Sequence, residues 1–230
     1  MELNSLRFGV FFLIFTAVLL ILPKKLRKTW LLLASFAFYL SWERIALIWL
    51  LLSSVMVWAC ALGIRDRQRK HFYLIFPIIW NILLLGIFKY AGLLDPIIRR
   101  TGLPLSFRQM AAPLGISFYT LRCISYITAV FRGTVCAAAN PADVVIYVSF
   151  FPQIISGPIE HPKNFFRELD DFEQKPLRDF TRVWRGSLLF VWGLFQKIVL
   201  AERLAMVTAA VFPHFEQYGF WEILAASLAY

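Results

Sequence analysis

Long apolar runs alternate with short charged segments along this sequence. Four of these runs consist mainly of Leu, Ile, Phe, Val and Ala: residues 6–22, 30–64, 72–90 and 183–200. About 20 consecutive apolar residues are enough for a helix to cross the hydrocarbon core of a bilayer. The second run exceeds that length and is interrupted by Glu43 and Arg44, so the sequence predicts two short helices joined at residues 41–44.

Two further runs, residues 113–133 and 140–165, are apolar over membrane-spanning lengths but contain polar side chains. Hydrocarbon cannot solvate hydroxyl, amide or guanidinium groups, so these groups must face protein, water or substrate. They belong to Ser117, Tyr119, Thr120, Arg122, Ser125, Tyr126, Thr128, Gln153 and Ser156. Pro152, Gly157 and Pro158 are expected to break the second helix near its far end, where broken backbone must be buried or line a wet cavity. The two runs therefore predict a polar chamber within a bilayer.

Composition supports the membrane interpretation. Of 230 residues, 60% are hydrophobic and 17% charged, whereas soluble domains contain about 45–50% apolar and about 25% charged residues. The 24 Lys and Arg outnumber the 14 Asp and Glu, but the cations gather in short loops, which is typical of topology determinants rather than nucleic-acid contacts. Cys60, Cys123 and Cys136 lack the spacing of a disulfide framework or metal site. We therefore expect an integral membrane protein that contacts lipid and binds no nucleic acid, metal or resident cofactor.

Two basic loops set the predicted orientation. The first basic loop contains Lys24, Lys25, Arg27 and Lys28, and the second contains Arg65, Arg67, Arg69 and Lys70. By the positive-inside rule both loops lie in the cytoplasm, with a helical hairpin between them. Residues 72–90 would then lead outward, which conflicts with the three arginines of the loop-like stretch 91–112. A re-entrant or interfacial helix in that stretch would remove the conflict.

The later part of the chain contains a helix start and an amphipathic segment. Asn140, Pro141 and Asp143 supply a cap, a first-turn proline and a first-turn carboxylate, so a helix should begin there. Residues 161–182 form a charged connector whose apolar residues recur at helical spacing, which predicts an amphipathic surface helix. Its apolar positions are Phe165, Phe166, Leu169 and Phe172. Altogether the sequence predicts an all-α, multi-pass transmembrane bundle with short, broken and interfacial helices.

Three segments resemble the membrane-bound O-acyltransferase superfamily, specifically its alginate O-acetyltransferase-like branch. These segments read GISFYTLRCISYITAVFRG, YVSFFPQIISGPIE and GLFQKIVLAERLA, in that order along the chain. The resemblance implies acetyl transfer to hydroxyls of a cell-envelope polysaccharide such as alginate, at the bacterial cytoplasmic membrane. An acyl donor would be the co-substrate, and periplasmic acetylation proteins would be partners.

In that family the catalytic His lies in a later helical region. Residues 1–230 are therefore expected to form the amino-terminal part of a single membrane-embedded acyltransferase domain and to lack the catalytic-His half. On this expectation the chain by itself has no acyltransferase turnover. His71 and His214 lie in or beside loops, and neither is placed for catalysis.

Six residues are candidates for substrate contact: Tyr119, Arg122, Ser125, Gln153, Glu160 and His161. A cation in the middle of an apolar run is costly, so Arg122 either contacts the donor or a developing oxyanion, or pairs with Asp143 or Glu160, or snorkels. Members of the resembled family often carry Gln here, so Arg122 departs from the family pattern. Glu160 and the Gly157–Pro158 turn mark a tunnel mouth or, alternatively, a helix terminator, and His161 is either a substrate contact or a hydrated interfacial residue.

Two other classes of function remain open at this stage. A transporter or channel also needs a polar path with broken helices, although no inverted repeat is visible. A non-catalytic scaffold of an acetylation complex is the other alternative.

Overall fold

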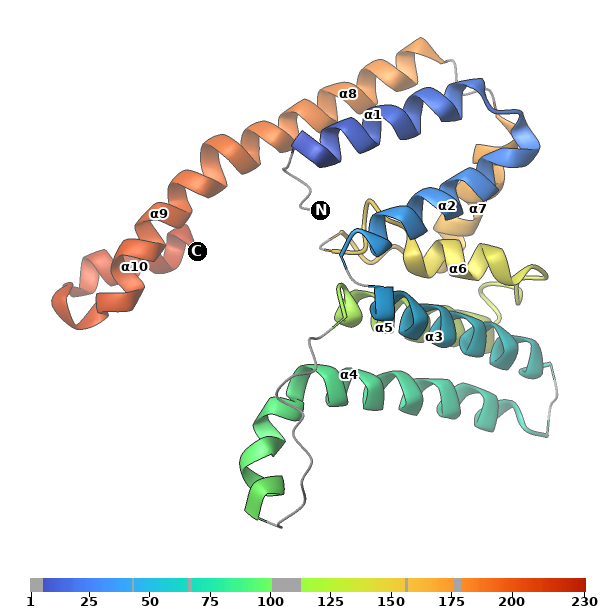
Figure 1. Cartoon of the computed structure of the whole chain (residues 1–230), viewed down its shortest axis with the longest axis horizontal. Coiled ribbons are helices and arrows are strands. Elements are labelled where there is room, and N and C mark those ends of the chain that lie inside the picture. The colour runs from blue at the N-terminus through green and yellow to red at the C-terminus, as the bar shows by residue number, and fades with distance from the viewer. Residues whose placement is uncertain (1–5, 43, 66–67, 101–112, 156, 176–178) are drawn as a thin grey trace. The chain divides into compact units, whose positions relative to one another are not determined.

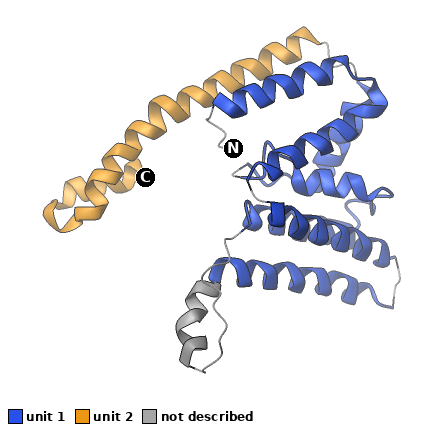
Figure 2. Ribbon diagram, in the orientation of Figure 1, with its two compact units in different colours: residues 1–175 blue, residues 176–230 orange. Residues whose placement is uncertain are grey.

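The computed structural model describes residues 6–42, 44–65, 68–100, 113–155, 157–175 and 179–230, and side chains throughout these ranges except at 91–100. Every regular element within these ranges is helical, which confirms the predicted all-α class (Figure 1). The chain divides into two compact units, residues 1–175 and 176–230 (Figure 2).

The first unit begins with α1 (Leu6–Ile21), a 3-10 turn (Lys24–Leu26), α2 (Arg27–Leu40) and α3 (Arg44–Gly63). Pro23 lies between α1 and the 3-10 turn, because proline cannot continue the ladder of backbone hydrogen bonds. The predicted division of residues 30–64 into two helices is confirmed. The turn between them is closed by backbone N–H groups of Ser41 and Trp42, which donate to carbonyls in the last turn of α2.

The next helix, α4 (Lys70–Arg100), is longer than the sequence indicated. Residues 91–100 were predicted to be loop-like, and this prediction is wrong, because they continue the helix. A single glycine such as Gly92 costs a helix only about 1 kcal/mol relative to alanine and does not end it. The remainder of the predicted loop, residues 101–112, lies outside the described residues, so the re-entrant or interfacial helix considered for 91–112 stays a prediction.

Three shorter helices follow: α5 (Ile116–Phe131), α6 (Pro141–Ser149) and α7 (Pro162–Gln174). The predicted start of α6 is confirmed, since the side chain of Asn140 accepts a hydrogen bond from the backbone of Ala142 at 3.0 Å. Its predicted membrane-spanning length is wrong, because α6 has only 9 residues. Pro152 disfavours helical backbone at the residue before it, and the chain already leaves the helix at Phe150, where ψ is 104°.

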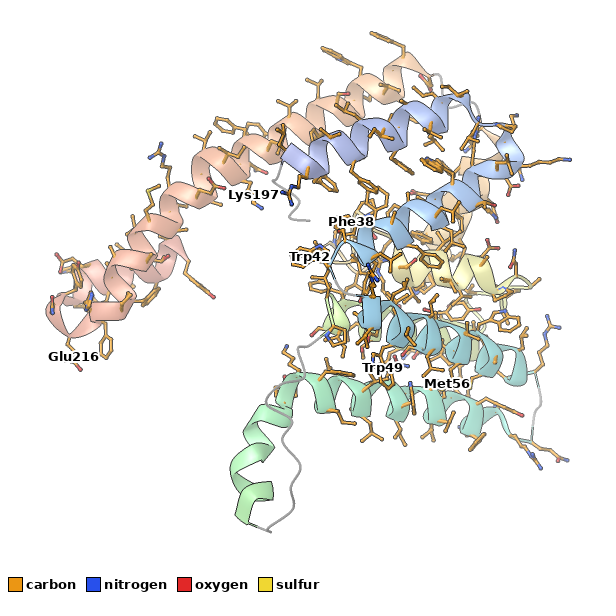
Figure 3. All side chains as sticks on the ribbon, in the orientation of Figure 1. Phe38, Trp42, Trp49, Met56, Lys197 and Glu216 are labelled. Carbon is orange, nitrogen blue, oxygen red and sulfur yellow. The ribbon has the colours of Figure 1, made fainter. Side chains whose placement is uncertain are left out.

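The helices of the first unit pack in successive layers, with α4 against α3, α3 against both α5 and α6, and α6 against α2 (Figure 1). Phe38 of α2 (Figure 3) and Phe151 are fully covered, and their tilted rings lie 5.8 Å apart between centroids. Phenylalanines of α1 contact both rings. On the opposite side of α3, Trp49 meets Phe88 of α4 at 5.6 Å.

Both basic loops lie at one end of this unit. Lys28 pairs with Asp143 at the start of α6, at 3.5 Å. Lys70 lies over the ring of Phe131 at the end of α5, 5.7 Å from its centroid. Since α5 and α6 are joined by the short segment 132–140, the two loops share an edge, as the predicted topology requires.

The second unit contains α8 (Phe180–Phe195), a π-helical turn (Gln196–Ala201), α9 (Glu202–Val211), a 3-10 segment (Phe212–Gln217) and α10 (Phe220–Ala229). Asp179 caps α8 by accepting from the backbone of Thr181 at 3.0 Å, and α10 packs against α9. The apolar run predicted at residues 183–200 is therefore part of a longer, nearly continuous helix.

Three helical stretches of the described chain are long and apolar enough to cross a membrane: Arg44–Gly63, Lys70–Tyr90 and Phe180–Gln217. The shorter apolar helices are Leu6–Ile21, Ile116–Phe131 and Phe220–Ala229. These helices indicate an integral membrane protein, as the composition predicted. The two polar runs at the centre of the chain form shorter helices that pack beside the long ones.

Candidate functional site

The start of α5 is held close to the turn that follows α6. Gly115, immediately before α5, has a φ of 69°, a conformation that favours glycine. A Cβ atom at this position would lie 2.4 Å from the carbonyl oxygen of Ile154, so only glycine fits without movement. This close approach brings the polar face of α5 next to residues 150–155.

Arg122 is the best-buried charge in this part of the molecule, with 1% of its surface exposed. Its Nη1 donates to the backbone carbonyl of Tyr147 at 2.5 Å, and its Nη2 donates to Oε1 of Gln153. The guanidinium also lies 5.4 Å from the centroid of the Tyr147 ring. Two predicted site residues, Arg122 and Gln153, are thus in direct contact.

The ion pair considered for Arg122 with Asp143 is not formed, because Asp143 pairs with Lys28 instead. The polar contacts that the structure gives Arg122 are with neutral groups, a carbonyl and an amide. Glu160 is near enough for its charge to act on the guanidinium, but makes no direct pair with it among the described residues. The site is therefore a buried cation held by neutral oxygens.

Tyr147 connects the remaining members of the site. Its hydroxyl donates to the backbone carbonyl of Glu160 at 3.0 Å and is also hydrogen-bonded by the Ser125 side chain. Its ring packs against Phe165 and Phe166 of α7, with ring centroids 5.1 and 5.5 Å apart. Sequence analysis missed Tyr147. The available signal was a phenol inside an apolar run, since a buried tyrosine hydroxyl usually needs a partner.

Tyr119 lies one helical turn before Arg122 and is completely buried. Its hydroxyl finds no hydrogen-bond partner among the described residues, and the hydroxyls of Thr120 and Ser149 share this property. Buried polar groups are nearly always hydrogen-bonded, so such a group needs an explanation in water or ligand. The structure places these hydroxyls on α5 and at the end of α6.

Glu160 and His161, the predicted mouth of the chamber, have different surroundings. Glu160 is half-buried and lines a cavity, whereas His161 is exposed. Nδ1 of His161 accepts from the backbone N–H of Lys163 at 3.3 Å, so this histidine caps the start of α7. That role fits the interfacial interpretation of His161 better than a contact with substrate.

A cavity of about 340 Å³ adjoins this group and is called the α7 cavity below. Its polar lining residues are Gln153, Glu160 and Glu168. Its apolar walls are Phe12, Phe15, Leu31, Phe150, Phe151, Pro152, Phe165, Leu169 and Phe172. The cavity is thus more apolar than the chamber predicted from the sequence. No cluster of His, Cys, Asp and Glu in the described ranges is arranged to hold a metal ion.

Two residues of the first basic loop fasten α7, the wall of this cavity. Nη1 of Arg27 donates to the carbonyls of Phe172 and Lys175 at 3.2 and 2.8 Å, at the end of α7. Nζ of Lys28 lies between three carboxylates, those of Asp143, Asp170 and Glu173, at 3.5, 3.0 and 3.3 Å.

The charge of Lys28 is well supported in this position. Burial lowers the pKa of Lys28, but its hydrogen bonds with Asp170 and Glu173 and the charges of Asp143 and Asp170 outweigh burial. The pKa is therefore raised above the ordinary lysine value. Sequence analysis treated Arg27 and Lys28 only as topology determinants, so their second role comes from the structure.

The known proteins with similar sequences reported below are named as O-acetylases or O-acetyltransferases. Over 210 residues the chain is 30% identical to the "Probable alginate O-acetylase AlgI" of Pseudomonas syringae pv. tomato, covering 86% of this chain and 39% of that protein. It is 31% identical over 208 residues to the protein of the same name from Pseudomonas aeruginosa, covering 85% and 39%. It is 31% identical over 226 residues to the "Peptidoglycan O-acetyltransferase" of Helicobacter pylori, covering 84% and 40%. No protein-family model and no solved structure matches the chain.

These similarities cover most of this chain but only part of each relative. The chain spans about two fifths of the length of the curated relatives it matches. The activity, substrates and partners of a whole protein are therefore matters for proposal.

Proposed function

We propose that this chain, a homologue of the membrane-bound alginate and peptidoglycan O-acetyltransferases, forms part of an enzyme that transfers an acetyl group to polysaccharide hydroxyls. The acceptor is a cell-envelope polysaccharide such as alginate, and an acyl donor is the second substrate. The homology and the membrane-spanning helices support this reaction and a location in the bacterial cytoplasmic membrane. Periplasmic acetylation proteins are proposed as partners that receive or present the acceptor.

The single observation that carries the proposal is the buried guanidinium of Arg122, held by neutral oxygens of Tyr147 and Gln153. Attack of a hydroxyl on an acyl carbonyl places negative charge on the carbonyl oxygen, and a fixed cation stabilises that charge strongly where water is excluded. In the proposed mechanism Arg122 binds the donor's anionic part or this oxyanion, and Gln153 fixes the guanidinium. The hydroxyl of Tyr119, which has no partner among the described residues, would donate a hydrogen bond to the same ligand.

Ser125 and Glu160 support the site through Tyr147, whose hydroxyl they both contact. We assign them to shaping the wall beside Arg122 rather than to proton transfer. His71 and His161, the histidines of the first unit, are not part of this cluster, and no role in proton transfer is proposed for them.

The test uses membranes that contain the intact gene product carrying this chain. These are incubated with radiolabelled acetyl-coenzyme A and with alginate or peptidoglycan fragments, and base-labile label in the polysaccharide is counted. Label should appear with wild type, fall sharply with Arg122→Gln, and stay near wild type with Arg132→Gln, which removes an exposed cation from the end of α5. Equal labelling by wild type and membranes lacking the protein would contradict the proposal.

A further inference from the structure

The walls of the α7 cavity fit hydrocarbon rather than sugar or nucleotide. They are formed by side chains of α1, α2, α7 and the turn after α6, and most are phenylalanine or leucine. A volume of about 340 Å³ lies at the small end of the range for ligand sites, about 300–1,000 Å³. This space suits a single acyl chain and is too small for a whole lipid.

The surface of α1 beside the cavity is apolar and exposed. Phe12 lines the cavity and is itself 36% exposed, so the wall that it forms reaches the surface of the unit. The next residues, Leu13 and Ile14, are 69% and 55% exposed. In a membrane protein, exposed apolar side chains of this kind contact lipid chains, because no polar solvent is present at that depth. A lipid chain can therefore enter beside α1.

The same cavity lies at the end of the unit that carries the first basic loop. The 3-10 turn Lys24–Leu26 packs against α7, which forms one wall. Nε1 of Trp30 donates to the backbone carbonyl of Phe15 at 3.1 Å, and tryptophan is enriched where the membrane meets water. A lipid whose chain occupies the cavity would have its headgroup at this level.

Two carboxylates at the cavity distinguish between headgroups. Lys28 forms ion pairs with Asp143, Asp170 and Glu173, whereas Glu160 and Glu168 form no ion pair with another described residue. Carboxylates beside apolar walls gain most from a ligand that brings a positive charge and N–H donors. They would repel an anionic headgroup.

We propose that the α7 cavity binds one acyl chain of a phospholipid whose headgroup is a primary amine, with the ammonium group hydrogen-bonded to Glu168 and Glu160. The cavity adjoins the Arg122 site and shares Gln153 and Glu160 with it, but the binding of a lipid chain does not rest on the proposed function. The wall of this site, α7, is held in place by the ion pairs of Lys28 and by the hydrogen bonds of Arg27 to carbonyls at the end of α7.

The experiment places the intact protein in vesicles doped with photoreactive phospholipids that share one diazirine-bearing acyl chain. The headgroups compared are ethanolamine, choline and glycerol, and crosslinked residues are identified by mass spectrometry. Label at Phe12, Phe15 and Leu169 should be about tenfold higher with ethanolamine than with glycerol, because a hydrogen bond to a charged group changes an equilibrium by about that factor. Label at Leu13 and Ile14, which face bulk lipid, should not depend on the headgroup.

Two variants separate the headgroup from the chain. Glu168→Gln should abolish the preference for ethanolamine while keeping chain labelling. Leu169→Trp should fill the cavity and remove its label, whereas Leu13→Trp on the outer face of α1 should not; if Leu169→Trp fails to fold, Glu168→Gln still decides. Equal cavity labelling by all headgroups in wild type would overturn the proposal. So would labelling confined to Leu13 and Ile14, which would show that protein, not lipid, fills the cavity.

Discussion

Replacing Arg122 with Gln removes the charge of the candidate site and most of its hydrogen bonds. The shorter side chain cannot reach both the Tyr147 carbonyl and the Gln153 amide, and it loses the contact with the Tyr147 ring. Each buried acceptor left without a donor costs about 1–3 kcal/mol, and the lost cation–π contact costs about 0.5–2 kcal/mol.

These costs are partly offset because the variant no longer buries a charge. The direct partners of Arg122 are neutral, so the change leaves no buried carboxylate unpaired. The loss of about 3–5 kcal/mol that is typical of a broken buried ion pair therefore does not apply. We expect a net loss of about 1–3 kcal/mol in the free energy of unfolding. Turnover should fall much further, by about 10²–10³-fold, if the guanidinium stabilises an oxyanion.

Thermal unfolding and acetyl transfer measured on the same detergent-solubilised preparation separate the two roles. Arg122→Lys is the matched control, because it keeps the charge but cannot form the two-pronged contact. It should retain more turnover than Arg122→Gln at similar stability. Wild-type turnover together with wild-type stability in Arg122→Gln would refute both the packing and the catalytic argument.

Four other predictions concern the scaffold and its orientation in the membrane. Lys28→Gln should weaken docking of α7 by about 1–2 kcal/mol and speed hydrogen exchange of its amides, whereas Lys25→Gln in the same loop should change little. Because the pKa of Lys28 is raised, its contribution should be full at neutral pH and disappear only as pH rises beyond the ordinary lysine value of 10.5; loss already near pH 8 would contradict this. Gly115→Ala should lower the free energy of unfolding by more than about 1 kcal/mol, because alanine disfavours the positive φ and its Cβ would meet the Ile154 carbonyl. An unchanged melting temperature would argue against this geometry. Cysteines in the two basic loops should react with impermeant reagents only from the cytoplasmic side, and labelling from the periplasm would disprove the topology.

Local signals in the sequence predicted much of this fold. The cap at Asn140 and the charged interruption at residues 41–44 act within one or two helical turns, so they could be read without knowing the neighbours. The membrane character followed from composition alone. A break at Pro152 was expected from the sequence, but the helix ends earlier than expected, because the backbone already leaves it at Phe150.

The contacts of the site depended on distant residues and could not be predicted. Arg122 and Gln153 were both recognised as candidates, but their direct contact depends on the close approach at Gly115. The partner of Asp143 turned out to be Lys28, more than one hundred residues earlier in the chain. Pairing over such separations is decided by packing, which a hydrophobic pattern does not encode.

The acetyl content of the cell envelope tests the central claim most directly. The gene that encodes this chain is deleted in its own organism, and acetate released by mild base is measured in the exopolysaccharide and peptidoglycan fractions. We predict that acetate falls in one fraction, returns with the wild-type gene, and stays low with Arg122→Gln despite normal membrane levels of that variant. Unchanged acetate in both fractions after deletion would contradict the assignment to polysaccharide O-acetylation.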